Sequence, residues 1–186
     1  MSLTRETYHV EVCGLSREFP LFEVAPGVRV AIFNMLGDVE IVRAAGAELA
    51  RRLAELTPPV EVIVTAEAKS IPLAYEVAAQ MNLPYVVLRK SYKPYMGEAI
   101  QAETLSITTG QPQTLYLDEK DRGLLAGKRV VIVDDVISTG STLQGMRLVL
   151  DKAGARVVAE AAVFTEGERA KWKNIIALGH LPVFTT

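Results

Sequence analysis

The chain has 186 residues, of which 49% are hydrophobic and 23% charged, and its formal net charge is -2. This composition is typical of one globular domain, so we expect residues 1–186 to form a single domain. The charge predicts no nucleic-acid partner, and no apolar run reaches the roughly 18 residues that span a bilayer. The first ten residues lack the apolar core of a signal peptide, and the single Cys13 cannot form an intrachain disulfide, so we expect a cytoplasmic protein without a membrane partner.

The first part of the chain is β-rich. Residues 8–34 are broken by Gly14, Pro20 and the turn signal Pro26-Gly27. Extended segments that follow each other so closely favour an antiparallel hairpin or flap. We expect residues 1–37 to form this flap, or hood.

The next segment alternates helix and strand. From about Val39 to Leu56 apolar residues recur at helical spacing, with Asp38 as a plausible N-cap. Val60–Val64 is a short apolar strand. "IPLAYEVAAQM" is a helix with Pro72 in its first turn, and we expect it to end at Asn82. "PYVVLRK" is the following strand.

Residues 91–120 are polar and have no clear helical period. Within them, "ETLSIT" and "PQTLYL" are expected to pair as a hairpin around "TGQP". A long segment of this kind is often functional.

The last part returns to strand, helix and strand: "KRVVIVDD", "STLQGMRLVLDKAG" and "ARVVAEAAVF", after which "NIIAL" and "PVF" finish the chain. The order of elements predicts an α/β fold with an open, mostly parallel, twisted sheet flanked by helices. We assign residues 38–164 to this core.

The most informative stretch is Val130–Thr142, "VVIVDDVISTGST". Asp134 and Asp135 come at the carboxyl end of a buried strand, where open parallel sheets bind ligands. Successive strand residues point to opposite sides, so the two carboxylates need not collide. Two adjacent acids still need a partner, and sugar hydroxyls or magnesium would suit them.

A hydroxyl-rich loop follows the acids and leads into a helix, whose N-terminus favours an anion. Gly140 allows a close backbone approach, and further donors are the hydroxyls of Ser138, Thr139, Ser141 and Thr142. The stretch therefore predicts a ribose 5-phosphate site. Simple helix capping by the hydroxyls and solvated strand-end acids are the plainer alternatives. A nucleoside triphosphate loop is disfavoured because the chain has no G-x-x-x-x-G-K-[ST] motif, and a phosphoacceptor Asp leaves the hydroxyls unexplained.

This motif resembles the phosphoribosyl-pyrophosphate motif of the type I phosphoribosyltransferases, and the order of elements matches from about Val39 to Phe164. Within that family the chain is most similar to the adenine and xanthine phosphoribosyltransferase branch. The resemblance implies transfer of ribose 5-phosphate from phosphoribosyl pyrophosphate to a purine base, with Mg2+ as cofactor and a homodimer as the assembly.

The resemblance also assigns roles. Asp134 and Asp135 would hold the ribose hydroxyls and magnesium, directly or through water, and Ser138–Thr142 would bind the 5-phosphate. Thr65–Ser70, "TAEAKS", corresponds to a pyrophosphate loop that often carries a strained or cis peptide; its expected binding residues are Ala66, Glu67, Ala68 and Lys69. Adenine enzymes usually have "EARG" here, so Lys and Ser replace Arg and Gly. Lys69 is otherwise a solvated lysine, although a cation is mildly unfavourable at a helix start.

Three more basic residues, Arg89, Lys90 and Lys93, would join Lys69 around the pyrophosphate. The lid would be Ser91–Gly110, with Glu98 and Glu103 as candidates for proton transfer. Residues 165–186 would complete the base site, whose expected contacts are Phe33, Phe164, Thr165 and Glu166. The plainer alternative for Phe33 and Phe164 is that they are core residues.

Two questions stay open at this point. Hypoxanthine-guanine enzymes carry an Asp where this chain has Ser138, which argues against that branch. Adenine, xanthine or a base outside the purines stays open as the acceptor, and adenine is favoured. The alternative to an enzyme is a regulatory protein that binds phosphoribosyl pyrophosphate or a nucleotide without catalysis. Some purine regulators combine this fold with a DNA-binding domain, for which we see no sequence here.

Overall fold

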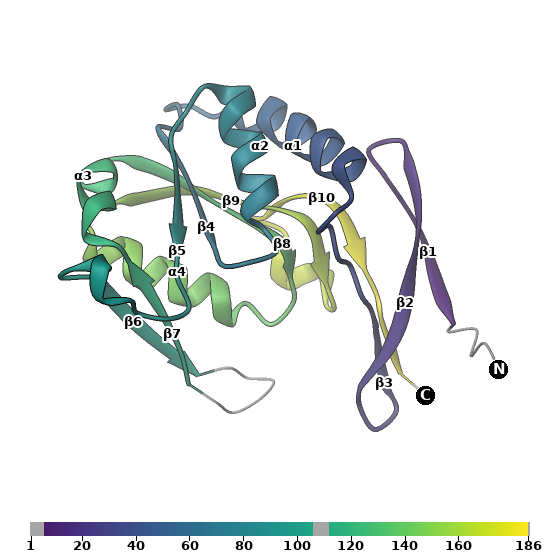
Figure 1. Cartoon of the computed structure of the whole chain (residues 1–186). Helices are drawn as coiled ribbons and strands as arrows, with labels where there is room; N and C mark the ends of the chain where they lie inside the picture. Colours follow the sequence, from purple (N-terminus) through teal and green to yellow (C-terminus); the bar gives the residue numbers. More distant parts are fainter. Residues whose placement is uncertain (1–5, 106–111, 186) are drawn as a thin grey trace.

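The computed structural model describes residues 6–105 and 112–185. Its centre is a five-stranded sheet in the order β10-β9-β8-β4-β5, and every neighbouring pair is parallel. This confirms the predicted α/β class (Figure 1). The strands are β4 (Val62–Ala66), β5 (Tyr85–Leu88), β8 (Arg129–Ile137), β9 (Arg156–Glu166) and β10 (Ile176–Leu181).

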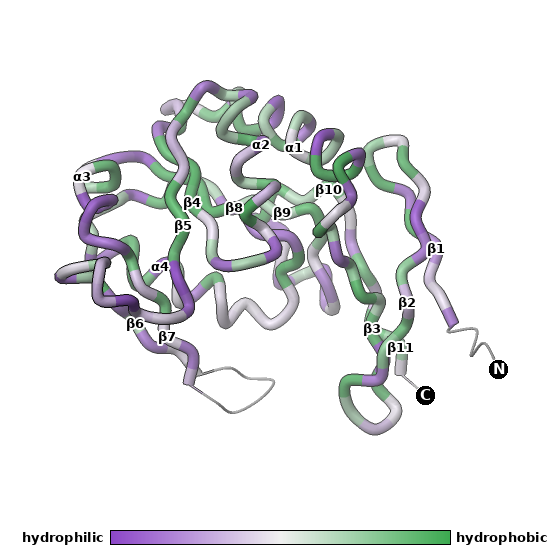
Figure 2. The backbone as a smooth tube through the Cα atoms, in the orientation of Figure 1, coloured by the Kyte–Doolittle hydropathy of each residue, from purple (hydrophilic) through white to green (hydrophobic). Residues whose placement is uncertain are grey.

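Helices and a hairpin cover the two faces of this sheet. On one face lie α1 (Val39–Leu53) and α2 (Ile71–Met81); on the other lie α4 (Ser141–Lys152) and the hairpin of β6 (Ile100–Leu105) and β7 (Pro112–Leu117). Because strand side chains alternate, Val131 packs under α1 and α2 whereas Ile132 packs under α4. Figure 2 shows the resulting hydrophobic strands at the centre of the molecule.

A separate antiparallel sheet forms the hood, as the first part of the sequence predicts. Its order is β1-β2-β3-β11, with β1 (Thr7–Val12), β2 (Leu15–Ala25), β3 (Val28–Ala31) and β11 (Val183–Thr185). A cluster of three aromatic rings attaches the hood to the core, with ring centroids 5.0 to 5.8 Å apart: Phe19, Phe33 and Phe164.

Local signals in the sequence explain where the helices begin and end. The Asp38 carboxylate accepts a hydrogen bond of 3.1 Å from the Ile41 N–H and caps α1 as predicted. Arg17 of the hood donates to both Asp38 and Glu40 at 2.7 Å, which ties β2 to this helix. Asn82 takes a left-handed conformation and ends α2, also as predicted.

The remaining elements are short: η1 (Pro94–Met96), η2 (Glu119–Asp121), α3 (Arg122–Leu125) and η3 (Arg169–Trp172). β6 and β7 pair as expected, although most of the "TGQP" turn lies outside the described residues. No helix in the described ranges is long and apolar enough to cross a membrane.

One boundary differs from prediction in a way that shapes the site. β8 continues to Ile137, past the two acids, because residues up to Ile137 stay paired with β9. Its pairing with β4 ends at Ile132, which leaves Asp134 and Asp135 next to the loop that follows β4.

Candidate functional site

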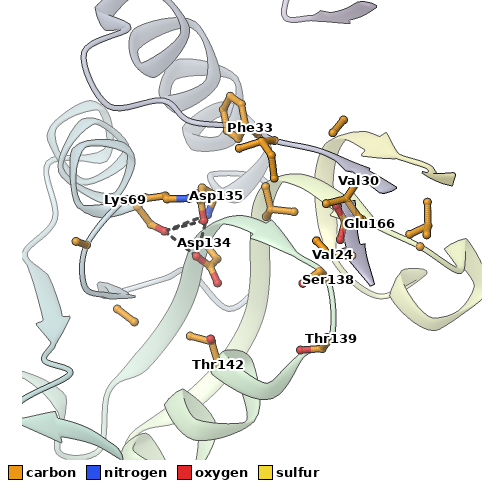
Figure 3. Close-up of a pocket in the computed structure, with 18 of the residues that line it drawn as sticks. Val24, Val30, Phe33, Lys69, Asp134, Asp135, Ser138, Thr139, Thr142 and Glu166 are labelled. Carbon is orange, nitrogen blue, oxygen red and sulfur yellow. Dashed lines mark hydrogen bonds between the residues drawn. The ribbon is translucent and has the colours of Figure 1, made fainter. Parts of the chain in front are cut away.

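A cleft of about 580 Å³ lies between the carboxyl end of the sheet and the hood. Its lining comes from the loop after β4, Lys90 after β5, the acids of β8, the loop before α4, the end of β9 with the turn that follows it, and the hood strands. These segments are far apart in sequence, and Figure 3 shows Lys69, Asp134, Thr139 and Glu166 around one space.

The loop before α4 is built to leave backbone donors free. The N-cap position is Gly140, which has no side chain to cap the helix. The hydroxyls of Thr139 and Ser141 contact each other at 3.1 Å, and Thr139 Oγ1 accepts a long hydrogen bond of 3.4 Å from the Ser141 N–H. Because the first turn of a helix has N–H groups without internal partners, this end of α4 favours an anion. Capping by Thr139 accounts for one of these N–H groups and leaves the hydroxyls of Ser138 and Thr142 unexplained.

Gly140 is required by its surroundings. Its φ is +81°, and a Cβ atom there would lie 2.9 Å from Cη2 of Trp172. The indole N–H of Trp172 donates to the carbonyl of Glu166 at 2.9 Å, which fixes the ring over the loop. Sequence reasoning missed Trp172, since nothing in the pattern of residues 169–172 links it to a loop thirty residues earlier in the chain.

The two acids lie closer together than strand alternation suggests. The Ser70 hydroxyl donates to Asp134 Oδ1 at 2.6 Å and lies 3.4 Å from Asp135 Oδ1. Figure 3 shows the two acids side by side. The expectation that the carboxylates point to opposite sides is therefore wrong, because both reach the same hydroxyl. Burial, with the neighbouring Asp135 charge, raises the pKa of Asp134 to about 7, and the bond from Ser70 opposes this rise.

The loop after β4 contains a cis peptide between Glu67 and Ala68. The side chains of Lys69 and Lys90 line the cleft with it. Glu67 accepts from the Lys90 N–H at 2.8 Å and from the Arg89 guanidinium. Although burial opposes it, these bonds hold the pKa of the Glu67 carboxyl below its usual value. Arg89 is thus paired with an acid rather than free.

The structure brings together only part of the expected basic cluster. Lys93 is exposed at the start of η1 and does not line the cleft. Glu98 and Glu103 are exposed and also lie outside the cleft lining. The Glu98 N–H donates to Glu119 at 2.9 Å. In this conformation neither glutamate reaches the site, and part of the expected lid, 106–110, lies outside the described residues.

The predicted base contacts need two corrections. Phe164 is 1% exposed and packs on Phe19 and Phe33, so it offers no face to the cleft. Thr165 is buried, and its hydroxyl bonds His180 Nδ1 at 2.9 Å. Phe33 and Glu166 do line the cleft, although Phe33 is itself only 4% exposed. Burial raises the pKa of the Glu166 carboxyl.

An apolar wall lines the same part of the cleft as Glu166, and sequence reasoning did not identify it. Its residues are Val24, Val28, Val30, Ile32 and Val183. The alternation in "VRVAIF" was too mixed to show which side chains would face inward. A wall of this kind suits a planar, mostly apolar ring.

Comparisons with known proteins agree with this geometry. The family model described as "Phosphoribosyl transferase domain" matches residues 34–179. The chain is 35% identical over 153 residues to a hypoxanthine/guanine phosphoribosyltransferase of Methanococcus voltae, covering 82% of this chain and 73% of that protein. It is 32% identical over 145 residues to the purine biosynthesis transcriptional repressor PurR of Bacillus subtilis, covering 78% of this chain and 49% of the repressor. The chain thus spans about half the length of that regulator.

Solved structures show the same fold at lower sequence identity. The adenine phosphoribosyltransferase of Thermoanaerobacter pseudethanolicus superposes with a TM-score of 0.68 and 21% identity, over 87% of this chain and 95% of that one. The enzyme of Trypanosoma brucei gives 0.65 and 22% identity, over 78% and 67%. At these identities the likeness establishes the architecture of the sheet and its helices.

Proposed function

Since this chain belongs to the phosphoribosyltransferase family, we propose that it transfers ribose 5-phosphate from phosphoribosyl pyrophosphate to a purine base. One observation carries the proposal. Asp134 and Asp135 lie in the cleft between the start of α4 and the loop that presents Lys69. A pair of hydrogen-bond acceptors between two places that favour anions matches a diol between a phosphate and a pyrophosphate.

Each part of the substrate has a proposed partner. The 5-phosphate binds the N–H groups and hydroxyls of 138–142, and the ribose hydroxyls donate to Asp134 and Asp135. The pyrophosphate lies against the loop 66–69, where Lys69 and Lys90 offset its charge. The base occupies the space between the apolar wall of the hood and Glu166. Roles for Arg89, Lys93, Glu98 and Glu103 stay predictions that would require the neighbouring segments to move.

Magnesium fits the residues present. Asp134 and Asp135 offer the hard oxygen ligands that Mg2+ prefers. Within the described ranges no group of three or more His, Cys, Asp or Glu residues could enclose a metal ion, so substrate oxygens and water would complete the coordination. Bound magnesium would neutralise charge on the leaving pyrophosphate.

The residues of the chain act mainly by positioning. In the proposed reaction the bond from the anomeric carbon to a pyrophosphate oxygen breaks, a bond to a ring nitrogen forms, and the nitrogen loses its proton. The acids and the phosphate loop hold the ribose on both sides of the anomeric carbon. Lys69 and Lys90 stabilise the departing charge, and the hood wall reduces access of water.

We propose a purine as the acceptor without narrowing it to one base. Ser138 argued for adenine, whereas the relative from Methanococcus voltae is named for hypoxanthine and guanine. Glu166 lines the base end of the cleft, and a carboxylate there can accept from the amino group of adenine or of guanine.

A second candidate is a regulator that binds the same ligand without catalysis. The similarity to PurR favours it, as does the ion pair that engages Arg89 with Glu67. An arginine held in this way contributes less to neutralising a leaving pyrophosphate.

We also propose a homodimer. Tyr75 on α2 and Tyr85 on the edge strand β5 are 58% and 38% exposed and form an edge-to-face pair at 6.0 Å. Light scattering should give twice the mass of one chain, and a monomer would contradict the proposal.

The test of function is pyrophosphate release from phosphoribosyl pyrophosphate and magnesium, with adenine, hypoxanthine, guanine, xanthine, uracil and orotate in turn. Release with a purine alone supports the enzyme and identifies the acceptor. Tight binding without release for any base supports the regulator. Replacing Asp134 and Asp135 together by Asn should abolish binding, whereas Asp151→Asn, at the far end of α4, removes a carboxylate without effect. Release with uracil or orotate alone would contradict the purine proposal.

A further inference from the structure

Ser70 connects two parts of the site that are 64 residues apart in sequence. It is the last residue of the pyrophosphate loop Thr65–Ser70 and the N-cap of α2, and it is 3% exposed. The Ser70 hydroxyl lies 2.6 Å from Asp134 Oδ1, and it accepts a hydrogen bond of 3.1 Å from the Asp135 N–H. One buried hydroxyl therefore contacts both members of the acid pair.

The capacity of a hydroxyl fixes the direction of these bonds. A serine has one O–H donor and two acceptor lone pairs. The N–H of Asp135 can only donate, so the single proton of Ser70 goes to a carboxylate. Asp134 Oδ1, at 2.6 Å, is a much nearer acceptor than Asp135 Oδ1, at 3.4 Å. Asp134 Oδ1 also accepts from the Asp135 N–H at 2.9 Å. Two donors therefore hold Oδ1, and the described residues provide no hydrogen bond to Oδ2.

Helix capping does not account for this serine. Ser70 occupies the N-cap of α2, where a serine ordinarily accepts from an N–H of the first turn. Its side chain makes no such bond here, because the hydroxyl turns toward the acids instead. In the "EARG" motif that this loop resembles, glycine stands at this position, so Ser70 is a point at which this chain departs from that motif.

We propose that Ser70 is a positioning residue that orients the Asp134 carboxylate so that Oδ2 faces the ribose hydroxyls. The proposal rests on the proposed function, because it requires a ribose ligand in the cleft. Ser70 itself contacts no substrate; it holds Oδ1 and leaves Oδ2 as the acceptor. The hydroxyl also makes the acid pair depend on the conformation of the pyrophosphate loop, since Ser70 directly follows Lys69.

The test compares ligands with and without the sugar hydroxyls. Calorimetry without metal measures the affinity for guanosine 5′-monophosphate and its 2′,3′-dideoxy analogue, and for the matching adenosine pair. Each affinity is measured on the original chain and on the variants Ser70→Ala, Ser70→Gly and Ser70→Thr. In the original chain the ribose forms bind more tightly. Ser70→Ala and Ser70→Gly should reduce that preference about tenfold, the scale of one hydrogen bond to a charged group. Affinity for the dideoxy forms should stay within about threefold.

The threonine variant is the matched control. It keeps the hydroxyl and should retain the preference for ribose. A thermal melt of each variant establishes folding; if Ser70→Ala does not fold, Ser70→Gly decides the question. Equal losses for ribose and dideoxy ligands, or an unchanged preference in both variants, would overturn the role of Ser70. If the original chain binds neither nucleotide pair, the proposed function fails and this proposal fails with it. That result differs from one in which the original chain binds the nucleotides and the Ser70 variants keep the same preference for ribose, which would overturn only the role of Ser70.

Discussion

The phosphate loop can be tested through Gly140, which combines a positive φ with a close neighbour. An alanine at this position must adopt a φ near +81°, which costs about 1–2 kcal/mol for a residue with a Cβ atom. Its Cβ atom would also lie 2.9 Å from Trp172 Cη2, so the indole must move. Moving the indole would break its hydrogen bond to the Glu166 carbonyl, which contributes about 1 kcal/mol to stability. We expect Gly140→Ala to lower the free energy of unfolding by about 2–3 kcal/mol.

Gly154 provides a matched control. Its φ is +73°, and a Cβ atom there would meet nothing within 4 Å. Gly154→Ala should therefore cost only the conformational part, about 1–2 kcal/mol. Urea denaturation of both variants, followed by circular dichroism, gives the difference. In a domain of this size about 1 kcal/mol corresponds to roughly 2–4 °C in the melting temperature.

A second background isolates the ring. In a chain that carries Trp172→Ala, a Cβ atom at position 140 no longer meets the indole. The loss of unfolding free energy caused by Gly140→Ala should then fall to that of Gly154→Ala. Equal costs for Gly140→Ala and Gly154→Ala in the unmodified chain would refute the packing of Trp172 on the phosphate loop. Gly140→Ala should also weaken nucleotide binding at least tenfold by crowding the approach to the backbone N–H groups, whereas Gly154→Ala should not.

Three other predictions concern single side chains. Burial raises the Asp134 pKa from 3.8 to about 7, so between these pH values the folded state keeps a proton that the unfolded chain has lost. The free energy of unfolding therefore falls as the pH rises through this window. Urea denaturation at pH 5 and pH 8 in EDTA should show this fall in the original chain, and Asp134→Asn should remove it. Thr65 has a buried hydroxyl without a partner among the described residues, so Thr65→Val should raise the melting temperature, and a decrease would contradict this. Lys69→Ala should weaken phosphoribosyl pyrophosphate in calorimetry more than a nucleoside monophosphate; equal losses would remove Lys69 from the pyrophosphate loop.

Local signals were sufficient to predict the fold. Apolar periodicity and the caps at Asp38 and Asn82 located α1 and α2, and the order of strands and helices indicated the parallel sheet. The string Val130–Thr142 likewise identified the acids and the loop that line the cleft. These features depend on residues that are close together in sequence.

The features that could not be predicted depend on contacts between distant segments. Ser70 reaches Asp134, Trp172 covers Gly140, and Glu67 pairs with Arg89 only once the strands are assembled. Phe164 was misjudged for the same reason: an aromatic residue near the end of a strand, as Phe164 is in β9, has the same sequence signature in a core as in a base site. Its burial follows from the two hood phenylalanines that pack on it.

The hood has a consequence for how the protein is made. Its sheet is completed by β11, which pairs antiparallel with β3 although almost the whole described chain lies between them. During synthesis β1, β2 and β3 leave the ribosome first, yet the last edge of their sheet must wait for residues 183–185. Until then β3 exposes an unpaired edge and the valines of the hood wall, a state that invites association between chains. We therefore expect the hood to stay aggregation-sensitive until the last residues of the chain have been synthesised.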